Sequence, residues 1–137
     1  MEIEFPIEFL VSGTPVSLQS DNAKAKEQWK ARVKDASSVA LPKPHFASSD
    51  RLAVTIYYLP EEPMQGDLDN IVKLILDGMC RHVYVDDRQI ERIVVQKFEP
   101  GNIFGFADPS SAIVRALNGE RPILYVRVSN DPFEELR

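Results

Sequence analysis

The chain has 137 residues, of which 44% are hydrophobic, and this length suits one domain built around one core. No apolar run approaches the roughly 20 residues of a membrane-spanning helix. Residues 1–5 carry acids where a signal peptide carries positive charge, so we expect a cytoplasmic protein without membrane segments. Taken alone, the formal net charge of −5 argues against a nucleic-acid partner, because phosphate backbones are held by clustered Lys and Arg.

The charge is unevenly distributed along the chain. Residues 61–91 contain eight acids and three bases, whereas residues 22–43 contain six bases and two acids. The acidic excess of the whole chain therefore equals that of one segment. A basic segment remains available for contact with nucleic acid.

The first half of the chain predicts a strand, a helix and a second strand. In residues 3–11, β-branched and aromatic side chains alternate with acids, which is typical of a strand. Asp21 or Asn22 can cap a helix over 23–37, where apolar residues recur at helical spacing. Residues 51–59 are rich in Val, Ile and Tyr and predict the second strand.

The second half predicts two more helices and three strands. The expected elements are a helix over 69–81, strands over 83–85 and 90–98 joined by a hairpin at 86–89, a short helix over 110–117 and a strand over 122–128. We expect a single domain over residues 1–137, within which 129–137 form a C-terminal tail that is loose at its end.

The segment 67–73, with the sequence DLDNIVK, places two acids next to the start of a predicted helix. Asp69 alone is explained as an N-cap that accepts hydrogen bonds from free helix amides. That interpretation leaves Asp67 unexplained, and crowded carboxylates repel one another unless a cation shares them. Magnesium takes oxygen ligands of this kind, so the pair indicates a metal site.

Two nearby features each have a structural and a catalytic interpretation. Lys73 and Asp77 can form an ordinary pair four residues apart, or the Lys73 ammonium can offset charge that develops on a scissile phosphate. Asp86 and Asp87 can be turn residues, or they can supply the third carboxylate of a metal site. The combination of all these acids favours the metal site.

Basic residues form a stripe on the first predicted helix, and they serve either as a solvated face or as a DNA track. The candidates for DNA contact are Lys24, Lys26, Lys30, Arg32 and Lys34. His45 and His82 match no metal-binding spacing and are interpreted as surface or packing residues.

Other carboxylate motifs fit poorly. An EF-hand loop needs Gly at its sixth position, which Val72 occupies here. A phosphatase-type acid pair follows an apolar strand, whereas Asp67 follows the polar segment 61–66. No glycine loop that could cradle a phosphate is present.

The order and spacing of these residues resemble the signature of RusA-like Holliday junction resolvases. The resemblance covers about residues 9–98 and includes the segment 13–15 before the basic helix. Its motif residues are Asp67, Asp69, Asn70, Lys73, Asp77, Asp86, Asp87 and Gln89.

The resemblance implies a small α/β or α+β domain with a mixed sheet flanked by helices. It also implies a homodimer that cuts four-way DNA junctions with magnesium or manganese, leaving a 5′-phosphate and a 3′-hydroxyl. Asp67, Asp69 and Asp87 match the family's essential acids and metal ligands, and Lys73 matches a lysine associated with catalysis. Asp86 could be a further ligand or a turn residue.

Asn70, Asp77 and Gln89 are expected to support those acids, and no organic cofactor is expected. Residues 61–66 are acidic, although the resemblance implies a basic segment there. Fewer phosphate contacts mean a lower affinity for DNA. Two other functions therefore stay open: a non-cleaving nucleic-acid-binding relative, and a metal-dependent phosphohydrolase of small nucleotides.

Overall fold

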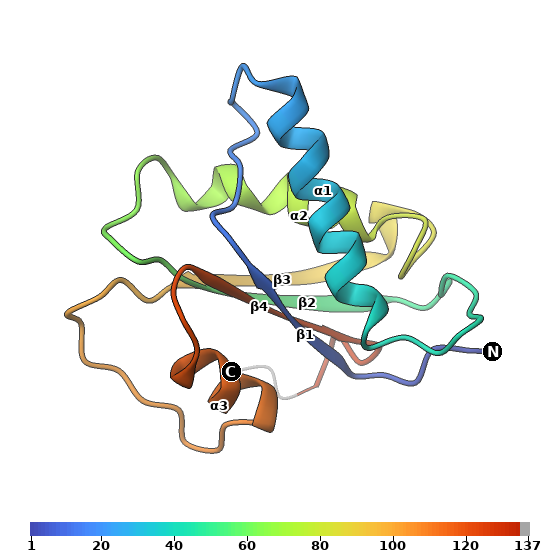
Figure 1. Cartoon of the computed structure of the whole chain (residues 1–137). Coiled ribbons are helices and arrows are strands. Elements are labelled where there is room, and N and C mark those ends of the chain that lie inside the picture. The colour runs from blue at the N-terminus through green and yellow to red at the C-terminus, as the bar shows by residue number, and fades with distance from the viewer. Residues whose placement is uncertain (135–137) are drawn as a thin grey trace.

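Four β-strands form one mixed sheet in the computed structural model, which describes residues 1–134 (Figure 1). The strands are β1 Ile7–Ser12, β2 Leu52–Leu59, β3 Ile90–Lys97 and β4 Ile123–Ser129, in the order β1-β4-β2-β3 across the sheet. β4 pairs antiparallel with β1 and β2, whereas β2 and β3 are parallel. Because parallel strands cannot be joined by a tight turn, the chain between β2 and β3 crosses over the sheet. This crossover carries the predicted site.

Helices cover both faces of the sheet, with α1 and α2 on one face and α3 on the other (Figure 1). They are α1 Ala23–Ser38, α2 Val72–Met79 and α3 Ser111–Asn118, and two short 3-10 turns, η1 Leu68–Ile71 and η2 Asp87–Gln89, flank α2. The expected small domain with a mixed sheet flanked by helices is confirmed. Within residues 1–134, no helix is both long and apolar enough to cross a membrane.

The main core lies between the sheet and the pair α1 and α2. Successive strand residues point to opposite faces, so residues two apart share a face. Val54 and Ile56 of β2 share the face that lies in this core, and both are fully buried. Tyr57, which follows Ile56 in the strand, faces the other side and packs against Phe98 and Phe106. A smaller cluster therefore anchors α3 and the preceding loop to the opposite face of the sheet.

The close contact between α1 and α2 depends on Gly78. A Cβ atom at this position would lie 2.8 Å from Cβ of Val33 and 2.9 Å from the Lys30 carbonyl oxygen. Any side chain would therefore force the helices apart. Gly78 fixes the position of α2, and with it the side chains that α2 presents to solvent.

The structure confirms the helix over residues 23–37 and its start. The Asn22 side chain accepts a hydrogen bond from the Ala25 amide at 3.0 Å, so Asn22, not Asp21, is the cap. The expected helix over 69–81 is shorter and begins differently. It is divided into the η1 turn and α2, which ends at Met79.

The predicted hairpin over 83–98 is wrong. Tyr84 forms isolated bridges with Ser48 and Cys80, and β3 pairs in parallel with β2, not with residues 83–85. The cause lies in the connecting residues, because Asp86 and Gln89 form a reciprocal capping box that starts the η2 turn. This turn directs the chain into the sheet beside β2.

The C-terminal segment turns back across the sheet after β4. Arg127 forms an ion pair with Glu134 at 3.1 Å, and Arg92 donates a hydrogen bond to the Glu134 carbonyl oxygen at 3.1 Å. The loose end predicted for the tail falls at residues 135–137, which lie outside the described residues.

Candidate acid and lysine site

The crossover between β2 and β3 places acids along the solvent side of α2. Asp69, Lys73 and Asp77 are spaced four residues apart through η1 and α2, which is the spacing of neighbours on one side of a helix. The opposite side of α2 is apolar and buried, with Ile75 and Met79 both at 0% exposure. The amphipathic sequence therefore holds the polar row outward.

The Lys73 ammonium lies between two carboxylates. Its Nζ atom is 2.8 Å from Asp77 Oδ1 and 2.6 Å from Asp87 Oδ2. The pKa of Lys73 is raised mainly by its hydrogen bond to Asp77 and, to a smaller degree, by its hydrogen bond to Asp87. The ammonium is therefore a permanent positive charge, and it connects α2 to the η2 turn.

Asp87 is held from its other oxygen by a buried tyrosine. The Tyr84 hydroxyl lies 3.0 Å from Asp87 Oδ1 and 2.7 Å from the Leu76 carbonyl oxygen. Burial is the main cause that raises the pKa of Tyr84, and the negative charge of Asp87 is the second. The hydroxyl therefore stays protonated and can act as a donor. Each oxygen of the Asp87 carboxylate thus has its own donor.

Asp86 and Gln89 have structural contacts in the same turn. Asp86 caps η2 by accepting from the Arg88 amide at 3.1 Å, and this hydrogen bond, as the main cause, lowers the pKa of Asp86. Gln89 Oε1 accepts from the Val85 and Asp86 amides, and its Nε2 donates to the carbonyls of Ser48 and Asp50. The Gln89 amide therefore fixes the turn that carries Asp87.

Asp67 and Asp69 lie at the other end of the row and are exposed. Asp67 occupies the N-cap position of η1, but its side chain makes no capping hydrogen bond. Asp69 lies inside the first turn, so the N-cap interpretation of Asp69 does not hold. Among residues 1–134, neither carboxylate forms an ion pair within 4.0 Å. Asn70 anchors the loop before α1, because its carbonyl accepts from the Leu18 amide at 2.8 Å.

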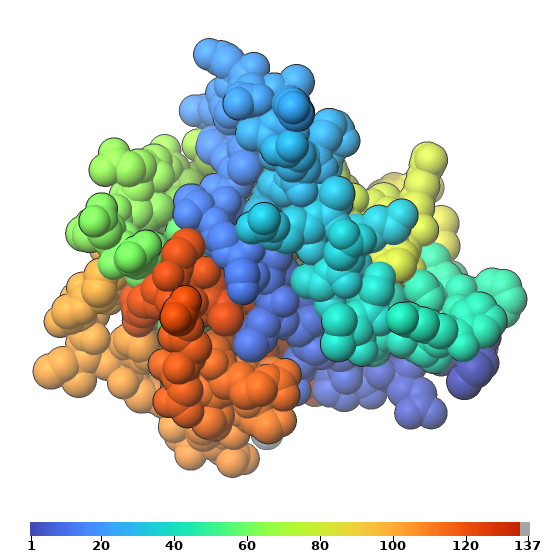
Figure 2. Space-filling model, viewed as in Figure 1, coloured from blue at the N-terminus to red at the C-terminus, as the bar shows by residue number. Residues whose placement is uncertain are grey.

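Asp67 also borders a pocket of about 330 Å³ between residues 14–17 and 60–67. Its lining includes Tyr58 and Met64 as well as the carboxylate-bearing Glu61 and Glu62. The space-filling view shows the loop of residues 61–67 at the surface, in green (Figure 2). The acidic segment 61–66 therefore forms a wall next to the predicted site.

The donor chemistry suits a hard divalent cation, because the side chains are carboxylates and magnesium prefers oxygen ligands. Within residues 1–134, no three Asp, Glu, His or Cys side chains stand close enough to surround one ion. Magnesium usually takes only one or two carboxylates and completes its shell with water and phosphate oxygens. The residues present therefore fit an ion that is shared with a phosphate substrate.

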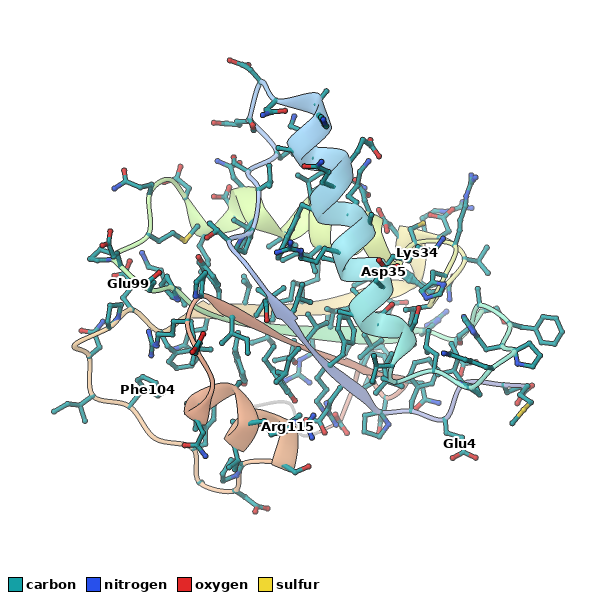
Figure 3. The ribbon with its side chains drawn as sticks, viewed as in Figure 1. Glu4, Lys34, Asp35, Glu99, Phe104 and Arg115 are labelled. Atoms are coloured by element: carbon teal, nitrogen blue, oxygen red, sulfur yellow. The ribbon has the colours of Figure 1, made fainter. Side chains whose placement is uncertain are left out.

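Three members of the basic stripe on α1 have contacts within the chain. Lys26 donates to the Leu18 carbonyl at 2.6 Å and Arg32 to the Ser12 carbonyl at 3.0 Å, so both hold the segment 12–20. Lys30 pairs with Glu27 at 2.8 Å. Lys24 and Lys34 are exposed, and Figure 3 shows Lys34 beside Asp35 near the C-terminal half of α1.

Tyr84 is the residue of this cluster that the sequence pattern did not single out. It lies between Val83 and Val85, and this composition is typical of a strand. Its position three residues before Asp87 was the available signal, because one helical or 3-10 turn can bring such residues together.

The acids, the lysine and the fold define a small α+β domain with an oxygen-rich anionic site in a parallel crossover. A comparison with protein families finds a match to the family described as endodeoxyribonuclease RusA over residues 16–104. The chain belongs to this family of DNA endonucleases. The match contains the whole acid and lysine cluster and ends before α3 and β4. A search of curated proteins found no match.

Proposed function

We propose that this protein is a divalent-metal-dependent, structure-selective endonuclease that resolves four-way DNA junctions during recombination and repair. The observation that supports this most strongly is the Lys73 ammonium between Asp77 and Asp87, on the same side of α2 as the exposed Asp69. Membership of the RusA family gives this cluster its chemical context.

Asp67, Asp69 and Asp87 would supply the carboxylates for magnesium or manganese, at one or two to each ion, because no three acidic side chains among residues 1–134 stand close enough to surround one ion. When bound, such an ion supplies a water of lowered pKa as the nucleophile and neutralises charge on the phosphate. Asp86 is assigned to the turn, because its carboxylate already caps η2. Asp77 is assigned to holding Lys73, and Gln89 to holding the η2 turn.

Lys73 would serve the reaction as a fixed positive charge. Its ammonium stands beside Asp87 and can approach a phosphate bound there, where it would offset the negative charge that grows in the transition state. Because the pKa of Lys73 is raised, it acts as an electrostatic group and not as a base at neutral pH.

Lys24 and Lys34 on α1, which are exposed, would contact the DNA phosphates. The wall formed by Glu61 and Glu62 would repel a phosphate backbone, so we expect the DNA to approach from the α1 side. We also propose a homodimer, since two cuts are needed to resolve a junction. β3 is an edge strand whose two faces expose Ile93 and Val94, at 45% and 36%, and a second chain could pair with this edge.

The test compares labelled four-way junction, replication fork and linear duplex, each incubated with the purified protein with and without magnesium. The proposal expects nicking that requires magnesium and is fastest on the junction, with Asp69→Asn as the inactive control. Binding of the junction without cutting would favour a non-cleaving relative. Nucleotide turnover without DNA binding would favour a small-molecule phosphohydrolase.

A further inference from the structure

The hydroxyl of Tyr84 joins two parts of the site that are not adjacent in the sequence. It contacts Asp87 Oδ1 at 3.0 Å and the Leu76 carbonyl oxygen of α2 at 2.7 Å, while the tyrosine residue is only 1% exposed. A ring packed in the core has a fixed position, and its hydroxyl therefore defines where Asp87 can lie.

The hydroxyl carries one proton, which one of the two oxygens receives at a time. A hydrogen bond to an ionised acceptor is about twice as strong as one between neutral groups, so the proton is directed to Asp87. The Leu76 carbonyl oxygen stays satisfied without this proton, because it already accepts from the Cys80 amide at 3.0 Å. Asp87 has no second donor for Oδ1 among residues 1–134.

We infer that Tyr84 is a positioning residue for Asp87. Its hydroxyl fixes Oδ1, and this leaves Oδ2, which faces the Lys73 ammonium in this structure, as the oxygen available to a metal ion. The inference rests on the proposed function, since Asp87 is taken as a metal ligand. Groups that orient a metal ligand typically change metal affinity or activity by about 10- to 100-fold when they are removed.

The substitution Tyr84→Phe tests this role because it removes one oxygen and keeps the buried ring. The fold should persist, since the Asp87 side chain is 32% exposed and water can replace the missing hydrogen bond. Tyr125→Phe is a matched control. Tyr125 is 2% exposed and its hydroxyl also bonds a carboxylate, that of Glu8, but on the α3 side of the sheet.

Two measurements decide the matter, the first being the manganese dissociation constant from calorimetry on each purified full-length variant. Tyr84→Phe should weaken manganese binding by about 10-fold or more, and Tyr125→Phe should leave it unchanged. Equal affinity in Tyr84→Phe and the wild type would overturn the inference.

The second measurement needs no metal. A double-mutant cycle compares the unfolding free energies of Tyr84→Phe, Asp87→Ala and the double variant, and residues in contact give non-additive effects. Additive effects would overturn the inference as well. If the wild type neither binds manganese nor cuts DNA, the proposed function fails, and the cycle still decides whether Tyr84 holds Asp87.

Discussion

The Lys73 ammonium lies 2.6 Å from Asp87 Oδ2 and so connects the α2 helix to the turn that precedes β3. The two residues are separated by 14 positions in the sequence. This pairing divides the acids of the crossover into two sets, because Asp77 and Asp87 share the Lys73 ammonium, whereas Asp67 and Asp69 form no ion pair within residues 1–134.

Replacing Lys73 with methionine should reduce junction cutting far more than it reduces stability. Partly exposed ion pairs contribute at most about 1 kcal/mol, and the Lys73 side chain is 48% exposed. Loss of a group that stabilises transition-state charge typically costs about 10²- to 10³-fold in rate. Denaturant unfolding and single-turnover cutting check the two parts. Lys97→Met, which breaks the pair with Glu99, is the matched control, and equal cutting by Lys73→Met and this control would refute the role.

Asp86 and Asp87 should respond differently to the same substitution. Asn is as good an N-cap as Asp, so Asp86→Asn should keep both the η2 turn and the cutting activity. Asp86→Ala should lower the stability, because the Arg88 amide loses its acceptor. Asp87→Asn should abolish cutting. Inactivity of Asp86→Asn in a correctly folded protein would instead make Asp86 a ligand.

His82 should make the protein less stable in mild acid. Burial, and then the charges of His45 and Lys34, lower the pKa of His82 in the folded state below its ordinary 6.5, while Asp35 opposes them. The unfolded chain therefore binds the proton more readily, and stability is lost as pH falls below about 6.5. Urea midpoints at several pH values measure this loss. His82→Gln should show a shallower decline, and an unchanged slope would mean that His82 does not contribute.

The exposed lysines of α1 should contribute to the affinity for DNA. The double substitution Lys24→Gln and Lys34→Gln should weaken junction binding and lower its salt dependence, by a slope of about 0.9 for each phosphate that the protein no longer neutralises. Lys43→Gln removes a charge from the exposed loop after α1 and serves as the control. Fluorescence anisotropy over a salt series provides the measurement. An unchanged salt slope in the double variant would place the DNA on another surface.

Local patterns predicted the regular elements well. The apolar spacing in α1 and the Asn22 cap lie within one segment, so the helix could be recognised without knowing its neighbours. The hairpin was mispredicted because strand pairing is not local. Nothing in residues 83–98 reveals that β3 pairs with β2 instead.

In the site, as in the fold, the local contacts were predictable from the sequence and the non-local ones were not. The Lys73 and Asp77 pair follows directly from a spacing of four residues, and the structure gives it at 2.8 Å. The Lys73 and Asp87 contact depends on how α2 packs beside η2, and the role of Tyr84 depends on the same packing. Such contacts require the three-dimensional arrangement. The family match shows the endonuclease class, whereas the ligand set remains a proposal.

The most direct test of the proposed metal site is magnesium-dependent cutting of a four-way junction by Asp67→Asn and Asp69→Asn. Both residues are exposed, and surface substitutions of this kind usually change stability by less than about 0.5 kcal/mol, so both variants should fold. We expect each variant to bind the junction but not to cut it at any magnesium concentration. Cutting at the wild-type rate by either variant would contradict the assignment of these carboxylates as ligands of the catalytic ion.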